Sequence, residues 1–409
     1  MAEQDIINQQ TDTVIQMPEE DNGQVITPWK AESKSGKFDY QKLIEQFGVE
    51  EITDELLNRF EKVTGYKPHL WMRRKLFFAH RHLNEILDDY EKGKQIFLYT
   101  GRGPTSASMH LGHSLSFILT SWLQKVFNAV VVIQMADDEK YYFKDITFEE
   151  TYNLGFENAK DIISFGFNPD KTFIFSNRDY SLTPCYHKVV HDIMKHAKIN
   201  QIQSLFGLEP SGCVGTMIWP VYQTAAAFSQ SFEDIFGTKE SYKCLVLHGV
   251  DQDVYFRMAR EISPDLGFHK PCSIMGKFLP ALEGTSKMSS TGTGPVTTIF
   301  MTDTEKEVYD KIRKYAFSGG GDTSEKHRKD GCNLTVDIPY QWLKFYMESD
   351  NELEHIANEY GSGRMLTGEI KKLLAGLIWE FINKHQKERA KVTPDVVKYF
   401  YNIEKFKNQ

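Results

Sequence analysis

The stretch QIFLYTGRGPTSASMHLGHSLSFILTSWLQKV, residues 95–126, decides the fold of this chain. Residues 95–100 are mostly apolar and predict a short buried strand, and the glycines and proline of 101–104 then turn the chain. From residue 110 onward, apolar side chains recur at helical spacing. A strand, a glycine turn and a helix in this order begin a βα unit, and the free N–H groups at the start of the helix suit a phosphate.

The rest of the chain extends this unit. Apolar strands at 130–135, 172–175 and 244–248 alternate with helices, which predicts an α/β fold with a Rossmann-type, doubly wound parallel sheet in a catalytic domain at 95–300. From 301 to 409 helical periodicity dominates and no strand pattern is sustained. We therefore expect an all-α C-terminal domain in that part of the chain.

The N-terminal part divides into two segments. Residues 1–24 contain six acidic residues and neither Lys nor Arg, a composition that predicts a disordered acidic tail. Residues 25–94 combine a short extended stretch with amphipathic patterns around 40–47, 55–62 and 76–90. This second segment is expected to be a mostly helical extension.

Composition limits the class of protein. The net charge of −8 argues against a generic nucleic-acid binder, so any contact with RNA must be made by a local basic patch. No apolar run is long enough to span a membrane and no signal sequence is apparent, so we expect neither membrane insertion nor secretion. The five cysteines include no C-x-x-C pair, which favours free thiols and a cytoplasmic location.

The first motif that carries chemistry is HLGH, residues 110–113, at the start of the expected helix. His110 and His113 can donate hydrogen bonds to phosphate oxygens that gain charge during a reaction. Gly112 lets a nucleotide lie close to the helix, where a side chain would obstruct it. The alternatives are a metal-binding histidine pair or simple packing, but the sequence shows no Cys/His cluster beside the two histidines.

The second motif is KMSST, residues 287–291, in a stretch rich in Gly, Ser and Thr. Such a stretch predicts a loop that can close over a bound nucleotide. Lys287 supplies a movable positive charge for a leaving pyrophosphate, and Ser289 and Ser290 add hydroxyl donors. Taken alone, this motif is also compatible with an unrelated surface loop.

In this order and at this separation, the two motifs resemble the nucleotide-binding signatures of class I aminoacyl-tRNA synthetases. Further stretches resemble the tryptophanyl-tRNA synthetases of the eukaryotic and archaeal type over roughly residues 25–400. These stretches are YTGRGP (99–104), IQMADDEK (133–140), VDQDVYFR (250–257), AFSGG (316–320) and MLTGE (365–369). The chain departs from the family at Ser290, where the usual pattern has a second lysine, and the group that compensates for this missing charge stays open.

The resemblance implies a tryptophan pocket, residue by residue. Tyr99 resembles the tyrosine that lines the indole pocket, and Gln134 resembles the glutamine whose carbonyl accepts the indole N–H. Glu139 resembles the acid that pairs with the substrate ammonium, while Gln223 and Gln252 resemble two glutamines that complete the amino and carboxylate contacts. The chemistry also holds without the family, because indole N–H only donates and a selective pocket needs a buried acceptor.

Simpler interpretations of the pocket residues stay open at this point. Tyr99 could be an ordinary core residue, and Asp137, Asp138 and Glu139 could form an exposed acidic turn. The motifs and the turn before them together imply an ATP site. Its expected residues are Gly101, Arg102, Gly103, His110, Gly112, His113, Lys287, Met288, Ser289 and Ser290. The resemblance implies that Lys287, His110 and His113 act in catalysis and that Mg²⁺ accompanies ATP, with metal ligands that the sequence does not indicate.

The activity implied by the resemblance is a two-step ligation of L-tryptophan to tRNA(Trp), by way of tryptophanyl-adenylate. The family implies a homodimer whose C-terminal helices read the anticodon. Residues 369–391 hold six basic residues against three acidic ones, so Lys384, Lys387 and Arg389 are candidate tRNA contacts, unless they are only a solvated helix surface. The alternatives to this function are a tyrosyl-tRNA synthetase and a nucleotide-binding regulator of the same fold without catalysis.

Overall fold

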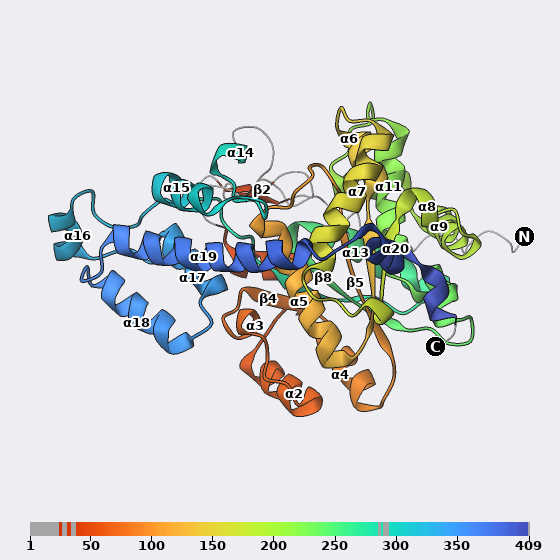
Figure 1. Cartoon of the computed structure of the whole chain (residues 1–409). Coiled ribbons are helices and arrows are strands. Elements are labelled where there is room, and N and C mark those ends of the chain that lie inside the picture. The colour runs from red at the N-terminus through yellow and green to blue at the C-terminus, as the bar shows by residue number, and fades with distance from the viewer. Residues whose placement is uncertain (1–23, 27–30, 34–37, 285–287, 289–293, 408–409) are drawn as a thin grey trace, which may run out of the picture.

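The computed structural model describes residues 24–26, 31–33, 38–284, 288 and 294–407. Figure 1 shows a central sheet covered by helices, with the C-terminal helices α15 to α19 extending to one side. The expected acidic tail falls almost wholly on residues 1–23, which lie outside the described residues, as do Lys287, Ser289 and Ser290 of the second motif.

Five parallel strands form the centre of the sheet, in the order β9-β8-β5-β6-β7. They are β5 (Ile96–Arg102), β6 (Val130–Met135), β7 (Thr172–Ser176), β8 (Lys243–Gly249) and β9 (Cys272–Gly276). The strand order reverses between β5 and β8, as in a doubly wound Rossmann-type sheet, so the predicted fold class is confirmed. Ligands of such sheets bind at this reversal, beyond the carboxyl ends of the strands.

Side chains alternate between the two faces of this sheet and feed two hydrophobic clusters. Leu98, Val131 and Leu245 pack in one cluster. Phe97, which precedes Leu98, and the residues that follow Val131 and Leu245 pack in the second cluster. Both faces are therefore buried, which explains why the strands read as nearly continuous apolar runs. The α-helices between residues 95 and 300 are α5 (Leu111–Phe127), α6 (Asp137–Phe143), α7 (Phe148–Ile163), α8 (Asn177–Tyr180), α9 (Pro184–His196), α10 (Ile199–Phe206), α11 (Val214–Ala225), α12 (Glu233–Phe236), α13 (Asp253–Leu266) and α14 (Gly294–Thr297).

The N-terminal segment joins the same sheet, which corrects one prediction. Helices α1 (Tyr40–Phe47) and α2 (Asp54–Thr64) lie where the sequence predicts them, but the pattern expected to be helical at 76–90 begins with a strand, β4 (Phe77–Arg81). All five residues of β4 are buried, and the strand pairs antiparallel with β9, with a register shift at Phe78. A short apolar run buried on both faces has no periodicity that separates strand from helix.

The remaining N-terminal elements are short. They are β1 (Gln24–Ile26), β2 (Ala31–Ser33), β3 (Glu50–Glu51), α3 (Leu70–Arg73) and α4 (Leu83–Glu91). Strand β3 pairs with β4 at the edge of the sheet, and β1 pairs with β2 in a separate two-stranded sheet.

Apart from one isolated bridge, the regular secondary structure of the described C-terminal part is helical. Its elements are α15 (Glu305–Tyr315), α16 (Ser324–Asp330), α17 (Ile338–Tyr346), α18 (Asp350–Gly361), α19 (Thr367–Arg389) and α20 (Pro394–Tyr401). Helix α19 contacts α15 and α17 at its outer part and α7 near the sheet (Figure 1). Residues of these helices, such as Trp342 and Ile378, belong to the same hydrophobic cluster as the sheet, so the C-terminal helices share a core with it. Among the described residues, no helix is long and apolar enough to cross a membrane.

Candidate active site

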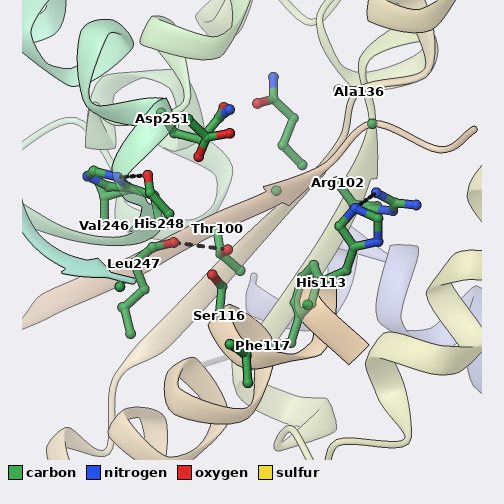
Figure 2. Close-up of a pocket in the computed structure, with 18 of the residues that line it drawn as sticks. Thr100, Arg102, His113, Ser116, Phe117, Ala136, Val246, Leu247, His248 and Asp251 are labelled. Carbon is green, nitrogen blue, oxygen red and sulfur yellow. Dashed lines mark hydrogen bonds between the residues drawn. The ribbon is translucent and has the colours of Figure 1, made fainter. Parts of the chain in front are cut away.

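A cavity of about 310 Å³ opens at the carboxyl ends of β5, β6, β8 and β9, where the strand order reverses. Figure 2 shows part of its lining, with Thr100 and Leu247 joined across β5 and β8. Both sequence motifs and the expected tryptophan pocket contribute to one cavity. The predicted site residues that line it are Tyr99, Gly101, Arg102, Gly103, His110, Gly112, His113, Gln134, Glu139, Gln223, Gln252 and Met288.

The first motif lies at the start of α5, as predicted. His110 is the N-cap residue of the helix, and the rings of His110 and His113 stack with centroids 3.5 Å apart. A Cβ atom added at Gly112 would lie 3.2 Å from two atoms of the His110 ring, so this position is crowded on the protein side as well. Among the described residues, no group of three or more His, Cys, Asp or Glu side chains could hold a metal ion, so the metal-pair interpretation has no support there.

The described part of the second motif lies beside the first motif. Met288, its one described member, is buried, and its Cβ would lie 3.8 Å from a Cβ added at Gly112. The chain that follows also runs along the first motif, because the Leu111 N–H donates to the Ile299 carbonyl at 3.1 Å and the Met301 N–H donates to the Met109 carbonyl at 2.8 Å. Two segments far apart in sequence are thus joined at one end of the cavity.

Arg102, at the end of β5, links this motif to the cavity wall. Its Nη1 donates to Nε2 of His113 at 2.9 Å, a bond drawn in Figure 2, and its Nε donates to Oδ1 of Asn158 at 3.0 Å. Because a guanidinium only donates, Nε2 of His113 must accept, and the ring proton of a neutral His113 sits on Nδ1. Burial lowers the pKa of Arg102 to about 10, so the group is still a cation at neutral pH.

One donor of this cation has no partner within the described part of the chain. Nη2 of Arg102 is buried there without a hydrogen bond. A buried, charged N–H group at the edge of a cavity suits an anionic oxygen, which could satisfy it with a charge-assisted hydrogen bond. The surroundings of Arg102 therefore fit a phosphate or carboxylate ligand.

The expected indole pocket lies between β5, β6 and α11. The Tyr99 hydroxyl donates to Oε1 of Gln134 at 2.5 Å, and both side chains are only 1% exposed. Nε2 of Gln134 donates to Oδ1 of Asn177 at 2.8 Å, and Nε2 of Gln223 donates to Oε1 of Gln252 at 3.2 Å. Tyr99 is thus both a core residue and a wall of the cavity.

The acidic residues at the start of α6 are buried, so the exposed-turn interpretation of them is wrong. Asp137, Asp138 and Glu139 are 1%, 7% and 9% exposed. The Glu139 carboxylate lies 2.5 Å from Nζ of Lys140. A Cβ added at Gly103 would come within 2.1 Å of Oε2 of Glu139, so a larger residue at 103 would force this carboxylate to move.

The structure adds side chains that sequence reasoning missed. Asn177 holds Gln134, Asn158 holds Arg102, and Phe256 packs edge-on against Tyr99 with ring centroids 5.9 Å apart. A signal for Asn177 was present, because it follows β7 directly, and polar residues at adjacent strand ends meet at one edge of a parallel sheet. No comparable signal marks Asn158, which lies inside α7.

The three candidate tRNA contacts on α19 separate into two groups. Lys384 and Lys387 are exposed. Arg389 faces α7 instead, where its Nε lies 2.6 Å from Oδ1 of Asp161 and its Nη2 lies 3.1 Å from Oε2 of Glu157. Its charge is neutralised within the protein, so Arg389 is not a candidate tRNA contact. A count of charges along the sequence does not show which side of a helix packs against a neighbour.

Comparison with known proteins agrees with the geometry of the cavity. Residues 91–383 match the family of class I tRNA synthetases for tryptophan and tyrosine. The chain is 47% identical to the cytoplasmic tryptophan–tRNA ligase of Homo sapiens over 92% of its own length and 80% of that protein. It is 44% identical to the cytoplasmic tryptophan–tRNA ligase of Arabidopsis thaliana, over 94% of this chain and 95% of that one. The crystal structure of the Plasmodium falciparum tryptophanyl-tRNA synthetase matches with a TM-score of 0.83 and 40% identity, covering 91% of this chain and 100% of that one.

Proposed function

The chain belongs to the class I tRNA synthetases for tryptophan and tyrosine, and we propose that the cavity at the reversal of its strand order is the site where it activates tryptophan. The protein is a tryptophan–tRNA ligase, which uses ATP to join L-tryptophan to tRNA(Trp). The high identity to tryptophan enzymes decides against both alternatives, the tyrosyl-tRNA synthetase and the inactive regulator.

One observation carries the assignment of the amino-acid pocket. Oε1 of Gln134 is a buried acceptor held beside Tyr99 in a wall that also includes Trp219 and Phe256. A flat aromatic ligand with one N–H donor suits such a site, since the ring contacts the aromatic walls and the N–H reaches the acceptor. An amino acid without that donor would lose this second hydrogen bond to Oε1, which would keep only the one from Tyr99, at a cost of about 0.5–1.5 kcal/mol.

In the first step, the tryptophan carboxylate attacks the α-phosphate of ATP, forming the adenylate and releasing pyrophosphate. We assign the substrate ammonium to Glu139 and the remaining amino and carboxylate contacts to Gln223 and Gln252. No side-chain nucleophile is needed, because orientation of the reactants and stabilisation of charge lower the barrier.

The phosphates belong, in this proposal, to the two motifs and to Arg102. His110 and His113 donate to oxygens that gain charge, Arg102 offers its buried Nη2, and Lys287 balances the leaving pyrophosphate. We also propose that Mg²⁺ accompanies ATP. The metal ion would neutralise charge on the phosphates, whose oxygens are ligands of the kind that Mg²⁺ prefers.

In the second step, a terminal ribose hydroxyl of tRNA(Trp) takes the tryptophanyl group from the adenylate and releases AMP. We propose that residues 95–300 form the catalytic domain and that helices within 301–409 bind the anticodon. We further propose a homodimer, and a cytoplasmic location like that in the names of the relatives.

The specificity can be tested directly. Tryptophan should support rapid ATP–pyrophosphate exchange, and the other standard amino acids should not, because only tryptophan supplies the indole donor to Gln134. The measurement is amino-acid-dependent exchange of labelled pyrophosphate into ATP, with each amino acid supplied in turn. A clear preference for tyrosine would overturn the assignment of the pocket.

The surviving tRNA contacts can be tested apart from adenylation. Changing Lys384 and Lys387 together to glutamate should raise the KM for tRNA and leave tryptophan-dependent exchange intact, because phosphate contacts depend on positive charge. Charging assays should show the defect shrinking as salt rises, since added salt screens these contacts.

The matched control for this pair is Lys62→Glu with Lys67→Glu, two exposed lysines in α2 and the loop after it. Arg389 must stay unchanged, because a glutamate there would place a third carboxylate beside Glu157 and Asp161. If charging is equally affected in both pairs, the α19 surface is not a tRNA-binding face.

A further inference from the structure

A chain of hydrogen bonds runs from the expected indole acceptor into the protein and ends at a carboxylate. Tyr99 donates to Oε1 of Gln134 at 2.5 Å, and Nε2 of Gln134 donates to Oδ1 of Asn177 at 2.8 Å. Nδ2 of Asn177 then donates to Oδ1 of Asp138 at 2.9 Å. All four side chains are buried, so water competes little for these bonds.

The direction of this chain depends on its last member. An ionised carboxylate can only accept, whereas the amides of Asn177 and Gln134 can each turn to present oxygen or nitrogen. With Asp138 as acceptor, Asn177 must point its nitrogen at it and its oxygen at Gln134. The Gln134 nitrogen then faces Asn177, and the Gln134 oxygen faces Tyr99 and the cavity.

The same direction decides what the pocket can bind. A hydroxyl such as that of Tyr99 adapts to either orientation of Gln134, because it can donate or accept. Indole N–H cannot adapt. If the Gln134 amide were reversed, its N–H₂ group would meet the indole N–H, and two donors would face each other.

We propose that Asp138, acting through Asn177, is a positioning residue that orients the Gln134 amide and thereby sets the preference of the enzyme for a ligand with an indole N–H. This inference rests on the proposed role of Gln134 as the indole acceptor. Asp138 itself touches no substrate in this arrangement, since Asn177 lies between it and Gln134.

Two longer contacts of Gln134 support the same orientation. Its Nε2 lies 3.3 Å from the Tyr186 hydroxyl and 3.4 Å from the Tyr222 carbonyl oxygen. The Tyr186 hydroxyl donates to that carbonyl at 2.7 Å, so its oxygen is available as an acceptor. Because these contacts are long, loss of the Asp138 anchor should weaken the orientation and not abolish it.

The protonation state of Asp138 sets the condition for a clean test. Burial raises the pKa of Asp138 to about 7, and the neighbouring Asp137 carboxylate adds to the increase. The other titratable groups around it are Glu139 on the same helix, Tyr142 at its end, Tyr186 on α9 and Tyr222 on α11. A protonated Asp138 could donate and release the orientation, so the test belongs at about pH 8 or above.

The test compares tryptophan with β-(3-benzothienyl)alanine, in which sulfur replaces the indole N–H. The ratio of their kcat/KM values in ATP–pyrophosphate exchange measures the preference for the donor. Asp138→Asn should lower this ratio roughly two- to tenfold, chiefly through a higher KM for tryptophan, because the indole hydrogen bond is weakened while the analogue has none to lose. A merely structural defect would reduce the kcat/KM for both substrates by the same factor.

Two further variants make the test sharper. Asp138→Asn combined with Asn177→Asp should restore the ratio, because the carboxylate moved to 177 accepts from both amides and again forces the Gln134 oxygen toward Tyr99. Asp137→Asn is the matched control. This adjacent buried carboxylate contacts Ser176 and the Arg178 N–H and does not take part in the series of hydrogen bonds from Tyr99 to Asp138. It should leave the ratio unchanged.

The possible failures are distinguishable. If the unaltered enzyme does not prefer tryptophan to the analogue, the proposed role of Gln134 fails. The inference about Asp138 is overturned if that preference exists and Asp138→Asn leaves it unchanged or lowers the kcat/KM of both substrates equally. It is also overturned if the paired change does not restore the ratio. Thermal unfolding of each variant shows that the comparison is made on folded protein.

Discussion

Replacing Lys287 with alanine should lower the rate of tryptophan-dependent ATP–pyrophosphate exchange by about 10²–10³, the loss seen when one donor to a developing charge is removed. Met288, next to it in the sequence, lies against Gly112 at the histidine end of the cavity. We propose, from the family resemblance and from the position of Met288, that this lysine contacts the phosphates. Tryptophan binding, measured by calorimetry without ATP, should change little because the indole pocket is untouched.

Two control variants frame this result. Lys398→Ala alters an exposed lysine on α20 and should leave exchange unchanged. Lys277 is the more informative comparison, because it lines the cavity and could supply the charge that Ser290 does not. If exchange were near normal in Lys287→Ala and greatly reduced in Lys277→Ala, Lys277 would have the role that we propose for Lys287.

Removing residues 1–94 should abolish both the folded state and activity. The deletion takes away β4, the antiparallel partner of β9, and would leave β9 as an unprotected edge. It also removes Arg81, whose Nε and Nη2 lie 3.0 and 2.8 Å from the carboxylate oxygens of Asp253. Asp253 is 1% exposed, and breaking a buried pair by removing one partner costs about 3–5 kcal/mol.

A shorter deletion provides the control for this result. Removing residues 1–23 should preserve exchange and the melting temperature, because the chain would then begin at β1, where Gln24 still accepts from the Asp39 N–H at 2.9 Å. Soluble yield, circular dichroism and exchange should be measured for both proteins. An active enzyme that begins at Gln95 would show that β4 is dispensable.

Local patterns were sufficient for the fold class. The strand at β5, the glycine turn and the helix α5 were all visible in one continuous stretch, since periodicity and turn residues act over a few positions. Strand β4 shows where this reasoning stops. Its Phe77 packs in the cluster that contains Trp71, whereas its Phe78 packs in a separate cluster with Leu43 and Phe47 of α1. A local pattern does not show burial on two faces.

The sequence by itself determined the parallel sheet, because the sheet depends on short-range periodicity and turn residues. Its short motifs also resemble those of a known family, and that resemblance implied the nucleotide site and the indole pocket that we propose. Only the tertiary structure decided which polar groups meet. Arg389 pairs with Asp161, and Asn177 joins Gln134 to Asp138, through contacts between elements far apart in the chain. The strand register aligns Gln134 with Phe175, and so brings Asn177 to the same edge of the sheet. Such partners are chosen by packing in three dimensions, where a buried charge or amide must find a complementary group.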